Sequence, residues 1–453
     1  MAPKSDLLIH NAIVVNEGRC HLGWVAVDGP FISATGDGDV PEDIAASAAS
    51  VVDARGCLLL PGAIDEHVHF RDPGLTHKAD IVTETAAAAA GGVTSFIDMP
   101  NTMPLSTTVA AVADKMERAS AVATANYGFY IGATNDNLDE LLRADFTAVA
   151  GVKLFLGSST GNMLVDSETT IRRIFTQVKA LIAVHAESET EIRRNRERLV
   201  AERGDDMPLE LHPAIRSRKA CVDATRCAVE LAGQTGARLH VLHISTADEL
   251  SLFAAGPVGG KRVTAETCPQ YLLFDSSDYA TLGSRVKCNP AIKDSADRAA
   301  LRSAVADGVI DCVATDHAPH LLAEKQGNAL TAVSGMPMIQ FSLPAMLTLA
   351  DDGVFSVEKV AEVMAHNPAT LYSIVNRGFI RKGYFADLVL AERADWTVTD
   401  ADVLSRCAWT PLAGMRLHWR VASTWLNGRR VWDGERVDPD VRGMALRYKP
   451  PGA

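Results

Sequence analysis

The middle of the chain, from about Gly62 to Gly378, alternates short apolar runs with longer helical patterns. Runs such as Thr83–Ala90 and Ala220–Thr235 favour helices, whereas the short runs, rich in Val and Ile, favour β-strands. The predicted strands are Ile64–His69, Val93–Met99, Tyr127–Gly132, Gly151–Leu156, Ile182–Ala186, Leu239–Ile244, Arg262–Thr267 and Ile310–Thr315. Strands that alternate with helices are typical of a parallel sheet.

Both ends of the chain have a β pattern instead, in short runs separated by Gly or Pro. Asn427-Gly428 between two such runs is a hairpin turn signal. The runs are Leu7–Val15, Val25–Asp28, Phe31–Ala34, Val51–Asp53, Gly383–Leu390, Ala422–Leu426 and Arg430–Trp432. Since two terminal β segments that flank one body can pair, we expect residues 1–60 and 379–453 to form one small β-sandwich domain.

Eight strands in alternation with helices predict the α/β class and a (β/α)8 TIM-like barrel over residues 61–378. A doubly wound open sheet is the structural alternative. It would more often show a glycine-rich phosphate turn after the first strand, and the sequence shows none there. In a barrel the chemistry lies at the carboxyl ends of the strands, so polar residues there are candidate site residues.

Composition and charge narrow the class of protein. The 453 residues are 47% hydrophobic and 22% charged, as in ordinary globular proteins. The net charge of −12 argues against nucleic acid as a partner, because a polyanion needs a basic surface. We expect no membrane partner, since no apolar run approaches spanning length. We also expect no secretory leader, because residues 1–6 lead straight into a short strand-like run. The eight cysteines are scattered without a Cys-x-x-Cys pair, which favours reduced thiols in a cytoplasmic protein.

The run Pro61–Asp72 is the most informative stretch, because it places His67 and His69 two residues apart at the end of a strand. Side chains at this spacing on a strand point to the same side, so both imidazoles can bind one cation. Neutral imidazole is the commonest protein ligand for zinc-like metals. The alternative is a pair of half-exposed histidines that bind no metal. Arg71 lies two residues after His69 and suggests that a charged substrate group binds beside the cation.

Four further candidate ligands lie at or near the carboxyl ends of predicted strands. They are Lys153, His185, His243 and Asp316. Each also has an ordinary structural explanation, since a single strand-end histidine is more often a core or rim residue and a strand-end aspartate usually caps a turn. His240, three residues before His243, should face the other way, and we interpret it as structural.

Lys153 is unusual because it lies inside the apolar strand Gly151–Leu156. A buried lysine must be neutral, paired or modified. An ammonium group cannot bind a metal ion, but a neutral amine can add carbon dioxide and become a carbamate. The two oxygens of that anion could bridge two cations, as two-metal hydrolytic sites require.

These residues resemble the amidohydrolase superfamily with a binuclear metal site, over essentially the whole chain. The motifs are the Asp65-x-His67-x-His69 pattern, the strand lysine, the two strand-end histidines and Thr315–His320. His69–Gly74 and Met99–Thr102 are most similar to the dihydroorotase family within the cyclic amidohydrolases.

The resemblance implies a role for each candidate residue. His67 and His69 would bind the more buried metal ion with Asp316, and His185 and His243 would bind the second, both ions being expected as Zn²⁺. A carbamate on Lys153, derived from CO2, would bridge them. Substrate contacts would come from Arg71, Asn101, Asn289 and His320. Three of them also have a simpler explanation: Arg71 would pair only with Asp72, Asn101 would cap a turn, and His320 would be a surface loop residue.

The family's activity would be reversible hydrolysis of (S)-dihydroorotate to N-carbamoyl-L-aspartate, a step of de novo pyrimidine biosynthesis. A metal-bridging hydroxide would attack the ring carbonyl, with Asp316 as general base and then general acid. The sequence departs from the commonest pattern at Lys293, where many members carry arginine. The small, polar 157–162 loop after Lys153 would be either a lid or an exposed turn.

Allantoinases and hydantoinase-like enzymes are the nearest alternatives, since they share metals and mechanism. Their substrates lack the ring carboxylate that Arg71, Asn101 and His320 would bind. A less favoured alternative is a non-catalytic dihydroorotase-like subunit, although such relatives usually lack one or more ligands. We expect a small-molecule substrate and a homodimer.

Overall fold

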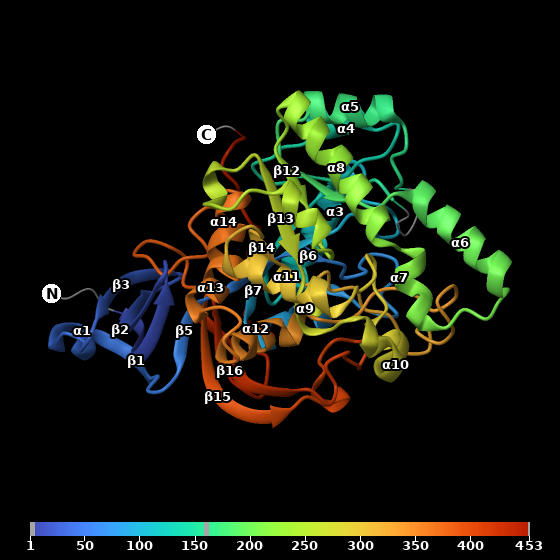
Figure 1. Cartoon of the computed structure of the whole chain (residues 1–453). Helices are drawn as coiled ribbons and strands as arrows, with labels where there is room; N and C mark the ends of the chain where they lie inside the picture. The colour runs from blue at the N-terminus through green and yellow to red at the C-terminus, as the bar shows by residue number, and fades with distance from the viewer. Residues whose placement is uncertain (1–4, 158–162, 452–453) are drawn as a thin grey trace.

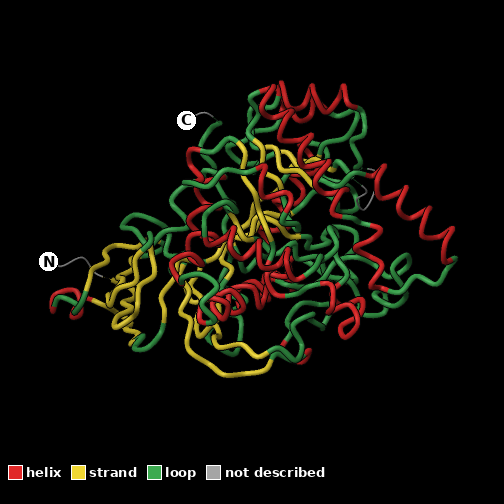
Figure 2. The backbone as a smooth tube through the Cα atoms, in the orientation of Figure 1, coloured by secondary structure: helices red, strands yellow, loops and turns green. Residues whose placement is uncertain are grey.

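The computed structural model describes residues 5–157 and 163–451. Its centre contains two parallel sheets, with strand orders β14-β13-β12-β11-β10-β9 and β6-β7-β8 (Figures 1 and 2). The strands are β6 Ala63–Val68, β7 Val93–Asp98, β8 Asn126–Phe129, β9 Ile131–Gly132, β10 Val152–Phe155, β11 Ile182–His185, β12 Leu239–Val241, β13 Val263–Thr267 and β14 Cys312–Val313. Every predicted strand of the middle region is therefore present, and Tyr127–Gly132 is divided into β8 and β9.

Helices pack around these strands, and the strands are buried along nearly their whole length, as expected where both faces are covered. Asp80 caps α2 (Ile81–Ala90) by accepting a hydrogen bond from the Thr83 amide. The longest helix, α8 (Arg218–Thr235), is followed by Gly236 in the left-handed conformation. The helices of eight or more residues are α2 Ile81–Ala90, α3 Val109–Val122, α5 Glu168–Gln177, α6 Glu189–Arg203, α8 Arg218–Thr235, α11 Ser295–Ala306 and α12 Ser342–Asp351.

Shorter helical segments fill the connections. They are α1 Glu42–Ser47, α4 Leu138–Arg143, α7 His212–Ile215, α9 Pro269–Leu273, α10 Tyr279–Leu282, α13 Val357–Ala361 and α14 Asn367–Leu371. A π-helical turn, Glu362–His366, joins α13 to α14.

A third sheet combines strands from both chain ends, in the order β17-β16-β15-β5-β1-β2-β3, with β4 paired to β1. Its strands are β1 Ser5–Asn16, β2 Arg19–Asp28, β3 Phe31–Asp37, β4 Ala48–Asp53, β5 Leu58–Pro61, β15 Leu388–Thr397, β16 Arg416–Leu426 and β17 Arg429–Trp432. The junction is the pairing of β5 with β1 on one side and β15 on the other. In Figure 1 the N-terminal strands, drawn in blue, and the C-terminal strands, drawn in orange and red, therefore lie next to each other.

Two details of this sheet bear on the sequence predictions. Asn427 and Gly428 join β16 to β17 with φ values of 51° and 80°, which confirms the hairpin turn. The predicted strand Gly383–Leu390 is too long at its start, because β15 begins at Leu388. Asp387 is held by an ion pair with Arg377 and accepts the Asn427 amide hydrogen bond, so the preceding residues follow a turn.

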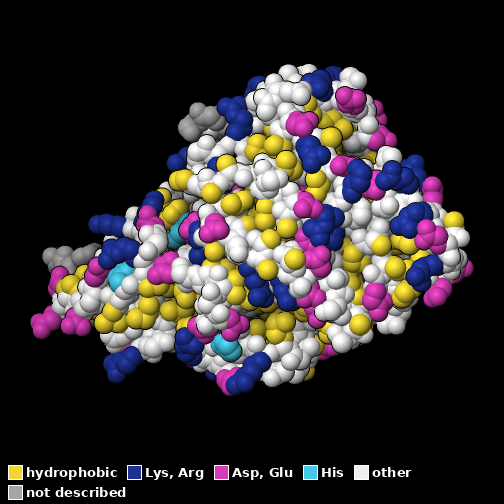
Figure 3. Space-filling view, viewed as in Figure 1, with side chains coloured by type: hydrophobic (Ala, Val, Ile, Leu, Met, Phe, Trp, Pro, Cys, Tyr) yellow, Lys and Arg dark blue, Asp and Glu magenta, His cyan; other side chains and the backbone are white. Residues whose placement is uncertain are grey.

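Three observations on the surface and the cysteines bear on the compositional analysis. In the described residues no helix is long and apolar enough to cross a membrane. Acidic and basic side chains are interspersed on the face drawn in Figure 3. All eight cysteines are free thiols, five of them buried.

Candidate metal and substrate site

The predicted site residues come together in one pocket of about 430 Å³ at the carboxyl ends of the parallel strands. His67 is on β6 and His69 follows it, Lys153 is on β10, His185 ends β11, and His243 and Asp316 follow β12 and β14. The lining includes all ten of them: His67, His69, Arg71, Asn101, Lys153, His185, His243, Asn289, Asp316 and His320. Their assembly from separate strands is what the barrel prediction requires.

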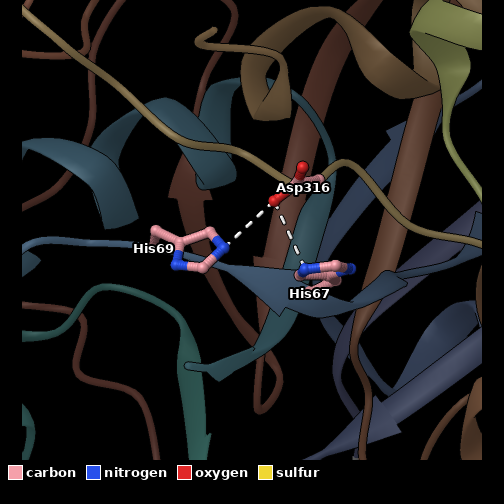
Figure 4. Close-up of side chains that lie close together, drawn as sticks. All are labelled: His67, His69 and Asp316. Atoms are coloured by element: carbon pink, nitrogen blue, oxygen red, sulfur yellow. Dashed lines mark hydrogen bonds and ion pairs between the residues drawn. The ribbon is translucent and has the colours of Figure 1, made fainter. Parts of the chain in front are cut away.

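His67, His69 and Asp316 form the tightest group. The Nε2 atoms of the two histidines lie 3.3 and 3.0 Å from one oxygen, Oδ1 of Asp316, and both rings point at it (Figure 4). Separations near 3.3 Å are those between ligands of a tetrahedral site whose bonds are roughly 2.0–2.1 Å long. The group is buried and its ligand atoms lie within 4.8 Å of one another, so it could hold one metal ion.

The hydrogen bonds behind these two histidines support a cation between them and Asp316. Nδ1 of His67 donates to Glu266 at 2.8 Å, and Nδ1 of His69 donates to the Asn101 side-chain oxygen at 2.7 Å. These bonds place the imidazole hydrogen on Nδ1, so each Nε2 presents a lone pair to the carboxylate of Asp316. The two lone pairs and the Asp316 carboxylate repel one another, and a positive ion between them would turn this repulsion into attraction. The three residues therefore fit a metal ion.

His185 and His243 form a second pair, with Nδ1 of His185 only 2.8 Å from Nε2 of His243. Nε2 of His185 lies 3.1 Å from Glu187, so the carboxylate can hold the ring hydrogen on that side. With that hydrogen on Nε2, Nδ1 of His185 accepts a hydrogen bond from Nε2 of His243 beside Lys153, whose Nζ lies over the Phe155 ring. The three side chains could hold a second ion.

Lys153 is fully buried, and burial lowers the pKa of its amine to about 7. The ammonium form is penalised because water no longer solvates it, and the carboxylates of Glu266 and Asp316 only partly offset that cost. A neutral amine at physiological pH is the species that can react with carbon dioxide. The environment therefore fits the predicted carbamate.

Three site residues have positive φ angles although none is glycine: Arg71 (64°), His243 (43°) and Asp316 (47°). Each such conformation costs on the order of 1–3 kcal/mol and persists only where the surroundings fix it. For Asp316, the preceding residue supplies part of this restraint: Thr315 donates from its amide and its hydroxyl to the buried carboxylate of Asp65, at 3.1 and 2.6 Å. The bond ties the loop after β14 to β6 and sets Asp316 beside His67.

The opposite wall of the pocket is basic. Arg71 donates from Nε to the Pro319 carbonyl at 3.2 Å, and its Nη2 lies 3.0 Å from Nε2 of His320. Lys78 lies 3.2 Å from the other ring nitrogen of His320 and pairs with Glu324 at 2.8 Å. Because neutral imidazole accepts through one nitrogen only, Arg71 and Lys78 compete for His320. Burial and these cations lower the pKa of His320, which keeps its ring neutral.

Contacts in the structure bear on the simpler structural explanations of three predicted residues. Arg71 does not pair with Asp72, whose carboxylate faces Arg118 at 4.0 Å instead. Asn101 holds His69, and His320 is buried with 6% of its surface exposed. Asn289 lines the pocket and contacts His212 at 3.2 Å.

Two other sequence predictions lie outside the pocket. Lys293 is buried away from the described lining, where its Nζ donates to the Ala291 carbonyl at 2.7 Å. Residues 158–162 of the predicted 157–162 loop lie outside the described residues.

Sequence reasoning missed four polar residues at the site: Lys78, Glu187, Arg216 and Glu266. Lys78 and Arg216 line the pocket, whereas Glu187 and Glu266 hold His185 and His67 from behind. Glu187 is two residues after His185, and Glu266 lies inside an apolar strand like Lys153. A charged residue within a predicted buried strand was the signal that could have identified Glu266.

Glu187 and Arg216 form a buried ion pair beneath His185. Burial alone raises the pKa of the Glu187 carboxyl, but the guanidinium of Arg216 and the His185 ring outweigh it and lower the pKa to about 2. A carboxyl with a lowered pKa stabilises the fold fully above its ordinary value of 4.5 and loses that contribution as the pH falls toward 2. We therefore expect Glu187→Gln to cost about 3–5 kcal/mol at pH 7 by leaving Arg216 unpaired.

Urea unfolding of the chelator-treated protein measures this difference in the free energy of unfolding. The gap between wild type and Glu187→Gln should shrink between pH 4.5 and 2. Glu191→Gln is the matched control, because its partner Arg194 has 67% of its side chain exposed, and we expect a cost below roughly 1 kcal/mol. Equal effects of the two substitutions, or a gap that does not depend on pH, would contradict this assignment.

Comparison with known proteins gives one consistent family. A model described as the amidohydrolase family matches residues 58–431. An allantoinase of Streptomyces avermitilis is 36% identical over 98% of this chain and 99% of its own, and a dihydroorotase of Halobacterium salinarum is 36% identical over 94% and 96%. Among solved structures, the L-hydantoinase of Arthrobacter aurescens superposes with a TM-score of 0.90 at 27% identity, covering 98% of this chain and all of the other.

Proposed function

Because the chain belongs to the amidohydrolase family, we propose that it is a metal-dependent hydrolase of cyclic amides and that its substrate is dihydroorotate. The reaction opens the ring amide with water and gives N-carbamoyl-L-aspartate, and it is reversible. Relatives named dihydroorotase and relatives named allantoinase support the reaction class equally. The choice of substrate depends on the pocket wall.

The observation that carries the choice is the state of Arg71. Its guanidinium is buried with 4% of its surface exposed, yet among the described residues no carboxylate oxygen lies within 4.0 Å of it. Burial lowers the pKa of this guanidinium, and the carboxylates of Asp316, Asp98, Glu324 and Glu84 offset that effect only in part. A buried charge is stable only when paired, and a planar fork accepts a carboxylate through two parallel hydrogen bonds. A substrate carboxylate would supply the missing anion.

The remaining side chains act on the bound ring. When bound, two divalent ions supply an ionised water at neutral pH and polarise the scissile carbonyl. His67, His69 and Asp316 would hold one ion, His185 and His243 the other, and carbamylated Lys153 both. Burial raises the pKa of Asp316, but His67 and His69 outweigh that effect and lower it. Asp316 is therefore ionised, accepts the proton of the attacking water and returns it to the departing ring nitrogen.

Arg71 gives a direct prediction for substrate recognition. We expect Arg71→Met to raise the KM for dihydroorotate by roughly 30- to 1,000-fold, since losing one partner of a buried charged pair costs about 2–4 kcal/mol. Arg71→Lys keeps the charge but not the fork, and we expect an intermediate value. Steady-state kinetics on the zinc-loaded protein measures both, and an unchanged KM would clear Arg71 of carboxylate binding.

Allantoin is the second candidate substrate, favoured by the Streptomyces relative that matches nearly the whole chain. It has no ring carboxylate, so its binding would leave Arg71 unpaired. A panel of dihydroorotate, allantoin and hydantoin with the zinc-loaded enzyme separates the candidates. We expect turnover of dihydroorotate only; turnover confined to allantoin would replace the substrate while leaving the chemistry, and no turnover by metal-loaded protein would favour a non-catalytic subunit.

We propose that the parallel strands close into the predicted (β/α)8 barrel, residues 61–378, with residues 1–60 and 379–453 as the β domain. Two observations support closure. The β8 and β9 segments follow one another along the chain, and beyond β14 the His317 carbonyl accepts a hydrogen bond from the His69 amide at 2.8 Å, with a parallel bridge from Val68. We also propose that the metal is zinc, that the protein is a homodimer and that it is cytoplasmic. Elemental analysis tests for zinc, and sedimentation tests for the dimer.

A further inference from the structure

A cluster of buried acceptors lies behind the pocket and plays no part in the proposed reaction. Glu66 on β6, His240 on β12 and Glu266 on β13 have no exposed surface, and none of them lines the pocket. Four of their atoms have no hydrogen-bond partner among the described residues: both carboxylate oxygens of Glu66, Oε2 of Glu266 and Nε2 of His240. Buried polar groups without partners are rare, and four in one cluster require an explanation.

The backbone of β6 explains why Glu66 and its neighbour His67 both approach Glu266. The pairing of β6 with β7 shifts register between Asp65 and Val68. A bulge of this kind suspends strict alternation and re-aims the side chains within it. The Tyr130 hydroxyl holds the same stretch of backbone by donating a hydrogen bond to the Glu66 carbonyl at 3.2 Å. The Glu66 carboxylate is thus directed into the interior.

The tautomer of His240 is set by its own strand neighbour. Nδ1 of His240 lies 2.8 Å from the Thr264 hydroxyl oxygen, and that hydroxyl donates to the Leu239 carbonyl at 3.2 Å. With the hydroxyl donating to the Leu239 carbonyl, His240 donates from Nδ1 and presents a lone pair at Nε2. That lone pair faces Oε2 of Glu266 at 3.8 Å, too far for a hydrogen bond and with acceptors on both sides.

Glu266 connects this cluster to the pocket. Its Oε1 accepts from Nδ1 of His67 at 2.8 Å and from the His243 amide at 3.0 Å, which leaves Oε2 for the interior. The ligand atoms of Glu66, His240 and Glu266 lie within 4.8 Å of one another. Two carboxylates and one imidazole, all presenting lone pairs, are ligands for a divalent cation such as zinc, and two carboxylates balance its charge.

We propose that Glu66, His240 and Glu266 bind a buried divalent metal ion, separate from the two expected in the pocket. The ion satisfies the four unpartnered acceptors at once. It also holds Glu266, and through Glu266 the ring of His67 and the backbone at His243. The proposal does not depend on the substrate, since a change from dihydroorotate to allantoin would leave this cluster as it is.

The competing explanation is a proton and a water molecule. A protonated Glu66 could donate to Oε2 of Glu266, and a buried water could donate to Nε2 of His240. The nearby thiol of Cys312 interacts with Glu66 as a weak donor and would serve either arrangement. The two explanations differ by one metal ion per chain, which can be counted.

The experiment compares zinc content, by mass spectrometry of the metal, after loading with zinc and dialysis against metal-free buffer. We expect Glu66→Gln to hold one zinc ion per chain fewer than wild type. Glu249→Gln is the matched control, because this glutamate is equally buried but accepts from Thr225 and Thr246 at 2.7 and 2.8 Å. We expect it to hold as much zinc as wild type.

Equal zinc content in wild type and Glu66→Gln would overturn the proposal in favour of the shared proton and water. If Glu66→Gln does not fold, wild-type crystals grown with zinc decide the matter. Anomalous density at the zinc edge should then show a peak bonded to Nε2 of His240 and to both glutamates. A map with peaks in the pocket but none at this cluster overturns the proposal without affecting the proposed function.

Discussion

Asp316→Asn is expected to reduce kcat for dihydroorotate by roughly 100- to 10,000-fold, the range that general acid–base catalysis contributes. Asparagine keeps the size of the side chain and one oxygen near His67 and His69, but it cannot accept a proton at working pH. The effect should therefore appear in kcat rather than KM. Stopped assays of both reaction directions, with zinc content measured in parallel, separate loss of the proton acceptor from loss of metal.

Asp311→Asn provides the control for this substitution. Asp311 is an equally buried aspartate immediately before β14, but it pairs with Lys261 at 2.8 Å away from the pocket. Its replacement should lower thermal stability and leave kcat of the folded enzyme within a few-fold of wild type. Near-normal turnover in Asp316→Asn would remove this residue from the proton path, and a loss shared equally by both variants would indicate a folding effect.

Lys153→Met is expected to lose turnover and tightly bound metal together. Methionine fills the space of the lysine stem but cannot become a carbamate, so the two metal positions lose their common ligand. We expect kcat to fall by more than roughly 100-fold, beyond the 10- to 100-fold that loss of a residue behind the ligands costs. Elemental analysis and kinetics on the same preparation measure both effects.

Lys115, another fully buried lysine, serves as control. Lys115 on α3 forms an ion pair with Asp98 and donates to the Met99 carbonyl at 3.0 Å. Lys115→Met leaves Asp98 buried and unpaired, which should cost about 3–5 kcal/mol of stability without changing metal per folded chain. Lys153→Met should do the reverse in metal-free protein, because it removes a buried amine rather than a paired charge. Full metal content in Lys153→Met would contradict the bridging role.

Much of the fold and of the candidate site could be predicted from the sequence. Each strand of the middle region is a short apolar run between turn residues, and this local pattern was sufficient to locate β6 to β14. The six candidate metal ligands could be identified because each lies in or just after such a run, whereas the four substrate contacts were identified through the family resemblance; the pocket contains all ten. Where a prediction failed, as at Gly383–Asp387, the backbone turns instead, with the Tyr384 amide donating to the Arg381 carbonyl, and Arg377 and Asn427 hold Asp387 after the turn.

The sequence by itself determined which strands form and which residues stand at their carboxyl ends, because both depend on neighbours along the chain. Only the tertiary structure decided which charged residues lie behind those ends. Glu187 with Arg216, and Glu266 with His67, are joined across separate strands and loops. Glu66 faces the interior because β6 bulges against β7. Side-chain direction at such points is set by pairing with a distant strand, and local alternation therefore cannot predict it.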